Sequence, residues 1–314
     1  MVTYEDAIDQ YATVAGIRVA YRMLGLKAGV PLLHLPSFRA TMDQVDPLSV
    51  NMIASHRPVI LVDNVGIGRS EGQVPTSFSR WADHCAEFIK SLGHDKVDVW
   101  GFSMGGCVAQ MLALNYPHLV RRLILCGSVP SIGPGVVPPP AGPFQAVRSA
   151  YGLQAEKPAV LKFLFHTSEQ SQAAGQAAWE RMCAARKHRI DHTGPDSTLR
   201  QVIAFSNFMN RKFISEGSFD RLHELKMPVL IIRGSEDFVL NEPTCRTLSN
   251  RICNAKVDVV MFLGAGHACH WQYAEESAAL ITKFLDGEQN LGSLAENDNI
   301  QILQRAQESV SSRL

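Results

Sequence analysis

The sequence predicts an α/β protein in which a mostly parallel central sheet is flanked by helices. Three observations support this prediction. Short apolar runs typical of buried strands alternate with helical patterns from residue 31 to residue 126. The alternation stops at a proline-rich stretch and resumes from residue 228 to residue 285. Finally, 314 residues with 46% hydrophobic side chains are enough to bury a sizeable core.

The first part of the expected sheet begins with a hairpin. Residues 11–23 alternate short apolar and polar steps around Gly16, which favours two antiparallel strands. Strands and helices then alternate, and strands connected by helices in this way run parallel with right-handed crossovers. The expected strands are 31–35, 58–63, 97–101 and 120–126, and the expected helices are 47–55, 78–92 and 104–115.

A helical insertion is expected to interrupt the sheet. Residues 128–143 hold six of the 16 prolines, so we interpret them as a linker that leaves the sheet. The pattern is then helical up to residue 225, for example at 170–187 and 199–211. The sheet resumes with strands at 228–233 and 257–263 and helices at 242–251 and 272–285. The predicted division is a core of residues 1–129 and 226–314 and a helical lid of residues 130–225.

Composition narrows the class of partner and the compartment. Lys+Arg and Asp+Glu both number 30, so the sequence has no excess of positive charge that would indicate binding to nucleic acid or to an anionic membrane surface. A small molecule with little charge is the expected partner. The seven cysteines form no C-x-x-C pair, which favours reduced thiols in a cytoplasmic protein. The acidic N-terminus has no apolar signal region, and no apolar run is long enough to span a membrane.

The most informative segment is the one around Ser103. An apolar strand runs into Gly101–Gly105, which has the form G-x-S-x-G, and a helical pattern follows directly. This arrangement is a nucleophile elbow, in which glycines let neighbouring backbone approach and the serine hydroxyl is pushed out at the end of the sheet. The N–H of Met104 opens the helix, so an unpaired donor at the positive end of a helix dipole would stabilise an oxyanion there.

A serine hydroxyl needs a base and a group that orients the base, and later strand ends supply both. Asp237 follows the strand at 228–233, and His267 follows the strand at 257–263. Loops at the carboxyl ends of parallel strands share one edge of the sheet, so both residues are expected near Ser103. The chain order of serine, acid and histidine is also the order of the α/β-hydrolase triad.

Each partner of Ser103 has an alternative at this point. Glu236 competes with Asp237 for the role of the acid, and Asp237 could instead cap the helix near residue 242 or pair with Arg233. His270 competes with His267, although His267 directly follows the glycine turn. Cys269 raises the idea of a metal site with these histidines, but no other Cys/His pair has zinc-ligand spacing. We therefore expect no metal and no cofactor.

Taken together, these motifs resemble the α/β-hydrolase superfamily over residues 11–286. Besides the elbow, the loop Asp63–Ser70 is similar to the family's D-x-x-G-x-G-x-S turn, and the turns at 234–237 and 266–267 match its acid and histidine loops. The resemblance implies that the helical insertion is a cap over the active site. It also disfavours the dehalogenase and epoxide-hydrolase branches, because the nucleophile is serine and not aspartate.

One segment departs from the family pattern. Members usually carry His-Gly-x after the third strand, and the N–H of x forms half of the oxyanion hole. Here the chain reads His34-Leu-Pro-Ser-Phe-Arg39, and a proline at x has no N–H to donate. We favour Phe38 as the donor, with the Arg39 N–H and the Ser37 hydroxyl as alternatives. The Arg39 side chain is either a ligand for a substrate carboxylate or enolate or a solvated loop arginine.

The lid and the C-terminal tail each allow two interpretations. Phe205, Phe208 and Met209 lie at helical spacing and either line an apolar substrate pocket or form the core of the lid. After Gly287 the tail is polar until Ile300, Leu303 and Val310 form a thin apolar stripe. This stripe predicts a short helix that docks on the body or on a second subunit in a homodimer, and disorder is the alternative.

The resulting hypothesis is a serine hydrolase that acts through Ser103, His267 and Asp237. Its substrate would be a small, largely apolar ester, lactone or thioester, or a diketone-like compound that is cleaved at a carbon–carbon bond, a reaction for which the family uses the same triad. One alternative is a non-hydrolytic enzyme of the same fold, namely a lyase, a cyclase or a cofactor-free oxygenase that uses the histidine as base. A ligand receptor derived from a hydrolase is another alternative.

Overall fold

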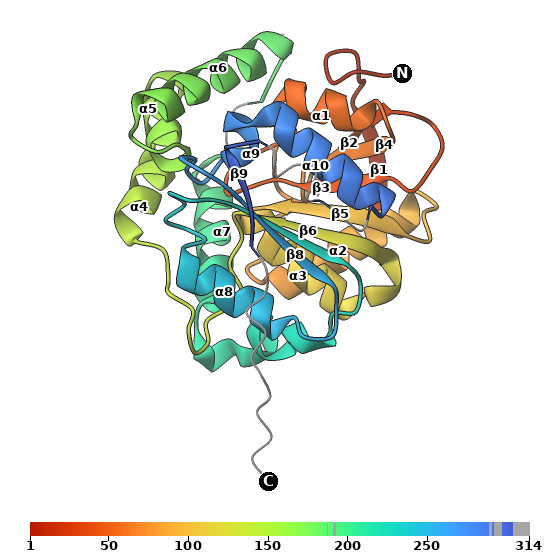
Figure 1. Ribbon diagram of the computed structural model, residues 1–314. Coiled ribbons are helices and arrows are strands. Elements are labelled where there is room, and N and C mark those ends of the chain that lie inside the picture. The colour runs from red at the N-terminus through yellow and green to blue at the C-terminus, as the bar shows by residue number, and fades with distance from the viewer. Residues whose placement is uncertain (187, 191–192, 289–290, 292–296, 304–314) are drawn as a thin grey trace.

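The computed structural model describes residues 1–186, 188–190, 193–288, 291 and 297–303. Its centre is a sheet of nine strands in the order β1-β2-β4-β3-β5-β6-β7-β8-β9 (Figure 1). The pairs from β4 through β3, β5, β6 and β7 to β8 are parallel, whereas β1–β2, β2–β4 and β8–β9 are antiparallel. The strands are β1 (Gln10–Val14), β2 (Ile17–Gly25), β3 (Leu32–Leu35), β4 (Pro58–Val62), β5 (Val97–Phe102), β6 (Val120–Cys126), β7 (Val229–Gly234), β8 (Val257–Phe262) and β9 (Ile300–Leu303).

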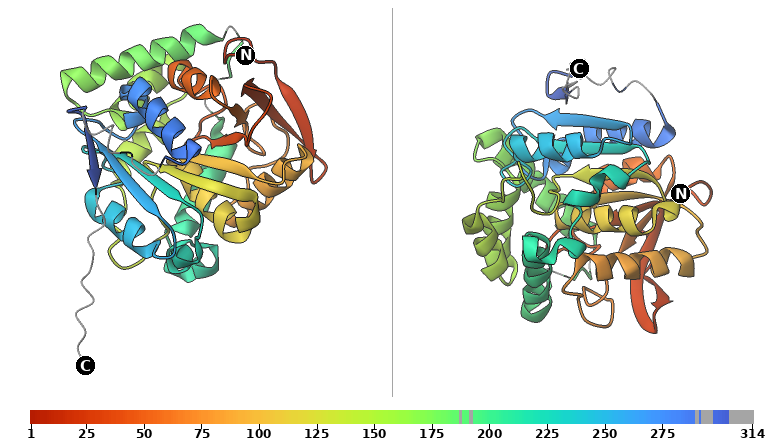
Figure 2. Two further views of the ribbon diagram at one scale, coloured as in Figure 1. Left: turned by 45° about the vertical axis from the view of Figure 1, so that its right-hand side comes forward. Right: turned by 90° about the horizontal axis from the view of Figure 1, so that it is seen from below.

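Helices cover both faces of this sheet. α1 (Pro47–Ala54) packs beside α10 (Ala274–Asp286), and α2 (Phe78–Ser91) packs beside α3 (Met104–Asn115) on the opposite face (Figure 2). In α2 the buried residues recur at helical spacing, from Phe78 and Trp81 to Cys85 and Ile89, so one apolar stripe meets the sheet. α3 is buried along almost its whole length. The central strands are buried from end to end, as parallel strands between two helical layers should be.

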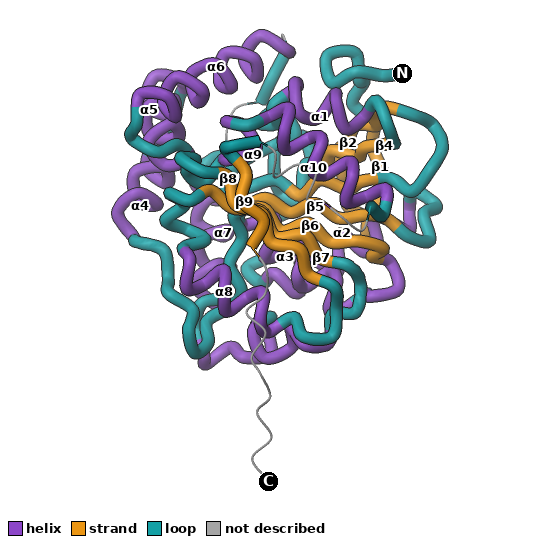
Figure 3. Tube along the Cα trace, viewed as in Figure 1, coloured by secondary structure: helices purple, strands orange, loops and turns teal. Residues whose placement is uncertain are grey.

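Between β6 and β7 the chain forms helices and no strand within its described residues (Figure 3). Side chains of α4, α5, α6 and α7 reach the cavities beside Ser103, so this insertion lies over the carboxyl edge of the sheet. The division at residues 129/130 and 225/226 stays a prediction. The helical segments are α4 (Ala141–Ser149), α5 (Leu153–Leu164), α6 (Glu169–Ala185), α7 (Pro195–Phe208) and the 3-10 turns η2 (Arg211–Glu216) and η3 (Phe219–Glu224).

The expected elements agree with the observed ones to within a few residues, with one correction in the tail. α8 (Glu242–Arg251) and α10 match the helices expected at 242–251 and 272–285, and a short helix, α9 (Cys269–Gln272), precedes α10. The tail is not helical at residues 300–303, where it forms β9 and pairs with β8. Pairing satisfies the backbone groups that β8 would otherwise expose at the edge of the sheet. Val310 lies outside the described residues, and the homodimer stays a prediction. No described helix is long and apolar enough to cross a bilayer.

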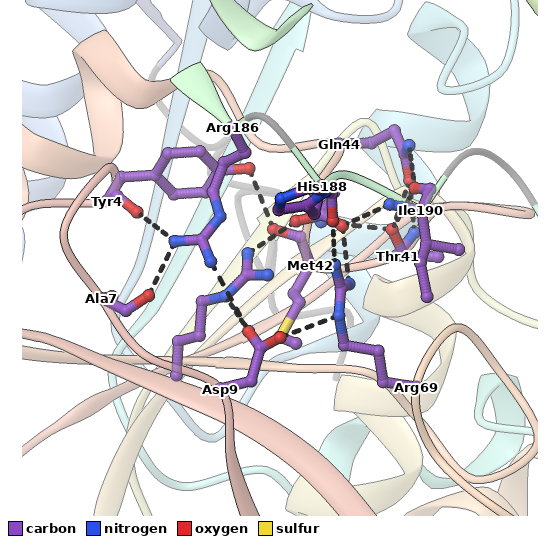
Figure 4. Close-up of polar contacts among 12 residues, drawn as sticks. Tyr4, Ala7, Asp9, Thr41, Met42, Gln44, Arg69, Arg186, His188 and Ile190 are labelled. Carbon is purple, nitrogen blue, oxygen red and sulfur yellow. Dashed lines mark hydrogen bonds and ion pairs between the residues drawn. The ribbon is translucent and has the colours of Figure 1, made fainter.

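A charge network with a buried centre joins the N-terminal segment to the loops beneath the insertion (Figure 4). Arg22 and Asp43 are its buried members, and Asp9, Arg69 and Arg186 are partly exposed. Asp43 is fully buried, and its carboxylate accepts hydrogen bonds from Arg22 Nη1 at 2.7 Å and Arg69 Nη1 at 2.6 Å. Asp9 binds the Nε atoms of the same two arginines at 2.7 and 2.9 Å. Two carboxylates thus hold two guanidinium groups in a closed ring of opposite charges.

The same network reaches the insertion. Asp43 Oδ2 accepts the Ile190 N–H at 2.7 Å, and Arg69 donates to the His188 carbonyl at 2.7 Å. Burial by itself raises the pKa of Asp43, but the charge of Arg22 and the hydrogen bonds from Ile190 and both arginines lower it below its ordinary value. The Asp43 carboxylate is therefore ionised in the folded protein at neutral pH. Its hydrogen bonds hold the loop that follows Phe38 in place.

Candidate active site

Ser103 stands on a strained turn between β5 and α3. Its backbone has φ +54° and ψ −119°, a region that non-glycine residues rarely occupy. The glycines of the elbow are required by close backbone approach. A Cβ on Gly105 would lie 2.1 Å from the Leu35 carbonyl oxygen, and one on Gly101 would lie 2.4 Å from Gly106 Cα. Any larger side chain there would push the serine turn away from the loop after β3.

The three predicted residues meet at one point of the carboxyl edge. His267 Nε2 lies 2.8 Å from Ser103 Oγ, and Nδ1 of the same ring lies 3.0 and 3.1 Å from the two carboxylate oxygens of Asp237. These distances allow the imidazole to accept the serine proton while Nδ1–H donates to the carboxylate. His267 and Asp237 are buried, whereas Ser103 is partly exposed.

The surroundings fix the orientation of His267. Phe102 and Phe163 place their rings 5.2 and 5.5 Å from the imidazole. Gly127, with φ +56°, leaves room for the ring, since a Cβ there would lie 2.9 Å from Cε1 and Nδ1. Asp237 is also held in place. Its Oδ1 accepts hydrogen bonds from the N–H groups of Val239 at 2.8 Å and Leu240 at 3.1 Å, in the loop before α8. The imidazole therefore has few orientations other than the one that faces Ser103.

The alternatives for the acid and the base have other contacts. Glu236 is exposed and accepts a hydrogen bond from Ser235 Oγ. Arg233 donates to backbone carbonyls, and Asn241, not Asp237, caps α8. His270 points its Nδ1 at Cys126 Sγ, 3.3 Å away.

The candidate oxyanion donors are the backbone N–H groups of Met104 and Phe38. The N–H groups of Met104 and Phe38 have no protein acceptor among the residues that the structure describes. Both residues line a cavity together with Ser103. The Arg39 N–H, by contrast, donates to Gln201 Oε1 at 2.9 Å and is therefore occupied. Phe38 itself is buried and stacks on Phe144 at 4.5 Å between ring centroids, so its backbone is fixed by the insertion. Its role in the oxyanion hole remains a prediction.

Two apolar cavities meet at Ser103, and both also contact Phe38 and Phe163. The first is bounded by α4, α5, α6 and the loop after β3. The second is bounded by the proline-rich linker, α4 and α7. A reacting carbonyl at Ser103 would thus have one apolar space for each of its two substituents. The insertion supplies much of both linings: Val147, Val160, Phe163, Leu164, Trp179 and Met182 in the first, and Phe144, Phe163 and Phe205 in the second.

The expected substrate-binding residues have different positions. Ser37 lines the first cavity and Phe205 the second, as a role in substrate binding requires. Phe208 lines neither, because it is buried against Phe78 with ring centroids 5.1 Å apart. Met209 lines neither cavity and packs on the core. These two residues belong to the packing between α7 and the body of the protein, which favours the second interpretation, the core of the lid, over a place in the substrate pocket.

The Arg39 side chain fits neither interpretation in this structure. Its guanidinium is buried and donates to the carbonyl oxygens of Val147 and Ala150 and to Glu156 Oε1. It is therefore neither solvated nor available to a substrate carboxylate. Arg39 instead ties the Phe38 segment to α4 and α5, and its own positive φ of 63° reflects the tight path of the chain here. Sequence alone gave no signal for Glu156 as its partner.

A group of buried side chains beneath the site could hold a metal ion. The ligating atoms of Cys126, Cys269 and His270 lie within 4.8 Å of one another. Sequence reasoning considered Cys269 and His270 but missed Cys126, which the topology brings from the end of β6. Burial raises the pKa of the Cys126 thiol and, with the neighbouring histidines His34 and His267, lowers the pKa of His270. The Cys126 thiol is therefore protonated and the His270 imidazole neutral. The absence of a metal stays a prediction.

His34, at the end of β3, gives a test of this buried region. Burial lowers its pKa to about 3, whereas an unfolded chain has the ordinary value of 6.5. Below pH 6.5 the unfolded state binds a proton that the folded state does not, so stability is full above that pH and falls as the solution is acidified. From pH 7.5 to pH 5 we expect His34 to account for about 2 kcal/mol of lost unfolding free energy. Urea titrations at both pH values measure this loss.

The matched variant for this prediction is His34→Phe, which keeps a ring against Trp100, whose centroid is 4.5 Å away. The variant should lose less stability on acidification than the parent by that same amount. An identical loss in both proteins would contradict the prediction, because His34 would then titrate alike in the folded and unfolded states.

The fold and this site define the class of the protein. Residues 31–274 match the model of the alpha/beta hydrolase fold family, and the chain belongs to that family. Among curated relatives, a 2-hydroxy-6-oxononadienedioate/2-hydroxy-6-oxononatrienedioate hydrolase of Burkholderia vietnamiensis is 29% identical over 72% of this chain and 76% of its own length. A 2-hydroxymuconate semialdehyde hydrolase of a Pseudomonas species is 28% identical over 88% and 94%. An alpha/beta hydrolase fold protein of Chitinophaga pinensis superposes with a TM-score of 0.80 at 27% identity, covering 91% of this chain and 99% of that one.

Proposed function

We propose that this protein is a serine hydrolase that cleaves small apolar esters or lactones through an acyl-enzyme on Ser103. The observation that carries the proposal is the position of His267, whose two ring nitrogens lie within hydrogen-bonding distance of Ser103 Oγ and of the Asp237 carboxylate. Named relatives of the chain are hydrolases, which supports the reaction class. The two apolar cavities at Ser103 support a small apolar substrate.

The proposed reaction has two halves. Ser103 Oγ attacks the carbonyl carbon while His267 Nε2 takes the proton of the serine hydroxyl. The resulting oxyanion accepts hydrogen bonds from the N–H groups of Met104 and Phe38. The C–O bond to the leaving group then breaks, and His267 returns the proton to the departing alkoxide. Water attacks the acyl-enzyme in the same way, His267 acting first as base and then as acid toward Ser103 Oγ. The products are the carboxylic acid and the alcohol, or the hydroxy acid for a lactone.

A second candidate is hydrolysis of a carbon–carbon bond in a diketone-like compound. The relatives favour it, because two of them are named as hydrolases of unsaturated oxo acids. The same serine, histidine and aspartate would act, but the leaving group would be a carbanion that must receive a proton at carbon. A panel of neutral esters, lactones and vinylogous diketones distinguishes the two reactions by which substrates are consumed.

The direct test is covalent labelling with a fluorophosphonate, followed by intact mass and peptide mapping. We expect one label per chain on Ser103, with turnover lost in proportion to labelling. Ser103→Ala should take up no label and retain at most about a thousandth of the turnover. An active protein whose Ser103 resists the probe would instead favour a non-hydrolytic enzyme that uses His267 alone as base. Stoichiometric binding of ligands without multiple turnover would favour a receptor.

A further inference from the structure

We infer that the site discriminates by charge: both substituents of the scissile carbonyl must be uncharged. This inference rests on the proposed function and narrows its substrate class. Among the described residues that line the two cavities at Ser103, none is an aspartate, glutamate, lysine or arginine. A carboxylate placed in either space would give up its hydration without meeting a cation.

Polar groups in the linings are mostly engaged with the protein. In the first cavity, Gln44 Oε1 accepts from the Thr41 N–H at 2.7 Å and the Thr41 hydroxyl at 2.8 Å, and its Nε2 donates to the Ile190 carbonyl at 3.0 Å. In the second cavity, the Cys107 thiol lies 3.5 Å from the Val129 carbonyl oxygen. The Ser37 hydroxyl has no protein partner among the described residues, so it can hydrogen-bond a neutral polar group of the substrate.

The cation adjacent to the first cavity is turned away and neutralised. Arg39 lies between Phe38 and Ala40, which both line this cavity, yet Arg39 itself does not line it and its guanidinium donates to the carbonyl oxygens of Val147 and Ala150. Glu156 Oε1 lies 3.2 Å from Arg39 Nη2, and both side chains are almost fully buried. The pair has no net charge. A charge that is balanced within a few ångströms exerts little attraction on an anion on the other side of the wall.

Charge discrimination would distinguish this chain from a hydrolase of dicarboxylates, the substrate type for which the Burkholderia relative is named. The expected substrates are neutral esters or lactones with an apolar acyl group on one side of the carbonyl and an apolar alcohol on the other. The Arg39–Glu156 pair is the feature of this chain that excludes carboxylate binding. For a carboxylate to bind, the arginine would need to face the cavity.

The test uses pairs of esters that differ by one carboxylate. For the acyl side, p-nitrophenyl butyrate is compared with mono-p-nitrophenyl succinate, in which a carboxylate replaces the terminal methyl. For the alcohol side, 4-acetylphenyl butyrate is compared with 4-carboxyphenyl butyrate. After subtraction of the rate of each ester without enzyme, which for the succinate includes attack by its own carboxylate, we expect kcat/KM to be lower by about 100-fold or more for the anionic member of each pair. Values within about threefold in either pair would overturn the inference.

A variant separates the ion pair from the rest of the lining. Glu156→Gln keeps a hydrogen-bond acceptor beside Arg39 but removes the balancing charge, so the ratio of kcat/KM for the succinate to that for the butyrate should rise about tenfold. Glu242→Gln, which breaks an exposed pair with Arg246, is the matched control and should leave the ratio unchanged. An unchanged ratio in Glu156→Gln would overturn the role of the pair. If that variant does not fold, the substrate pairs on the natural protein still decide the inference.

Failure of the inference is distinct from failure of the proposed function. If neutral esters are not turned over and Ser103 takes up no fluorophosphonate, the serine hydrolase proposal itself is wrong. If Ser103 is labelled and anionic and neutral esters react alike, the hydrolase stands and the charge discrimination does not.

Discussion

Asp237→Asn should lower kcat by about 10⁴-fold with little change in KM or in stability. The amide is nearly isosteric with the carboxylate, but its NH₂ group can donate to His267 Nδ1, which favours the wrong histidine tautomer. The neutral amide also leaves the imidazolium unstabilised. Both carboxylate oxygens lie within 3.1 Å of His267 Nδ1, so no other acidic group is needed for this role. Steady-state kinetics with a neutral ester measures the loss, and circular dichroism verifies that the variant folds.

Glu236→Gln is the matched control for this experiment. Glu236 is the neighbouring carboxylate, but it is exposed and contacts Ser235, so its variant should keep turnover within about twofold. A large loss in Glu236→Gln together with a small one in Asp237→Asn would reverse the assignment of the acid. Equal small losses would show that His267 needs no carboxylate partner for the reaction being measured.

The second large effect is expected on stability. Asp43→Asn should lower the free energy of unfolding by about 3–5 kcal/mol, because it leaves Arg22 and Arg69 buried with half of their opposing charge. The loss should appear as a lower urea midpoint with an unchanged slope. Since the folded-state pKa of Asp43 is depressed, its contribution is full above the unfolded value and is lost as the pH falls through the folded value. The difference between the two proteins should therefore shrink in strong acid.

Asp220→Asn provides the comparison for Asp43→Asn. Asp220 also pairs with an arginine, Arg211 at 3.3 Å, but both side chains are about half exposed. Water screens such a pair, so its loss should cost less than about 1 kcal/mol. If the two variants proved equally stable, burial would not be what makes the Asp43 network important. Turnover of Asp43→Asn at temperatures where it is folded also reports how far the network positions the Phe38 segment, because Asp43 binds the insertion at Ile190.

The two predictions concern different parts of one arrangement. The Ser103, His267 and Asp237 side chains lie on loops that the parallel sheet brings to one edge, and the proposed chemistry depends on their mutual distances. The Asp43 network and the Arg39–Glu156 pair hold the loop after β3 against the insertion, and this loop carries Phe38. Catalytic geometry and stability are therefore linked through a short segment, residues 37–46, whose N–H groups and side chains face both the core and the insertion.

Local patterns determined much of this protein without reference to its folded form. The apolar runs predicted the central strands and the helices between them, because a strand buried on both faces is mostly apolar. The G-x-S-x-G string identified Ser103, since few residues other than glycine permit the close backbone contacts of the elbow. The strand ends at 234 and 263 then pointed to Asp237 and His267, because the carboxyl ends of parallel strands share one edge of the sheet.

Tertiary structure alone decided the properties that depend on partners distant in the chain. Arg39 was expected to be a substrate ligand or a solvated residue, but it is buried and paired with Glu156, 117 positions later in the chain. Phe208 and Met209 had the spacing of pocket residues, yet the packing of α7 directs them to the core. Residues 300–303 form a strand because the edge of β8 offers unpaired backbone groups, which a local apolar stripe does not reveal. Periodicity and turn chemistry act between near neighbours, whereas charge pairing and edge pairing require the folded chain to bring distant residues together.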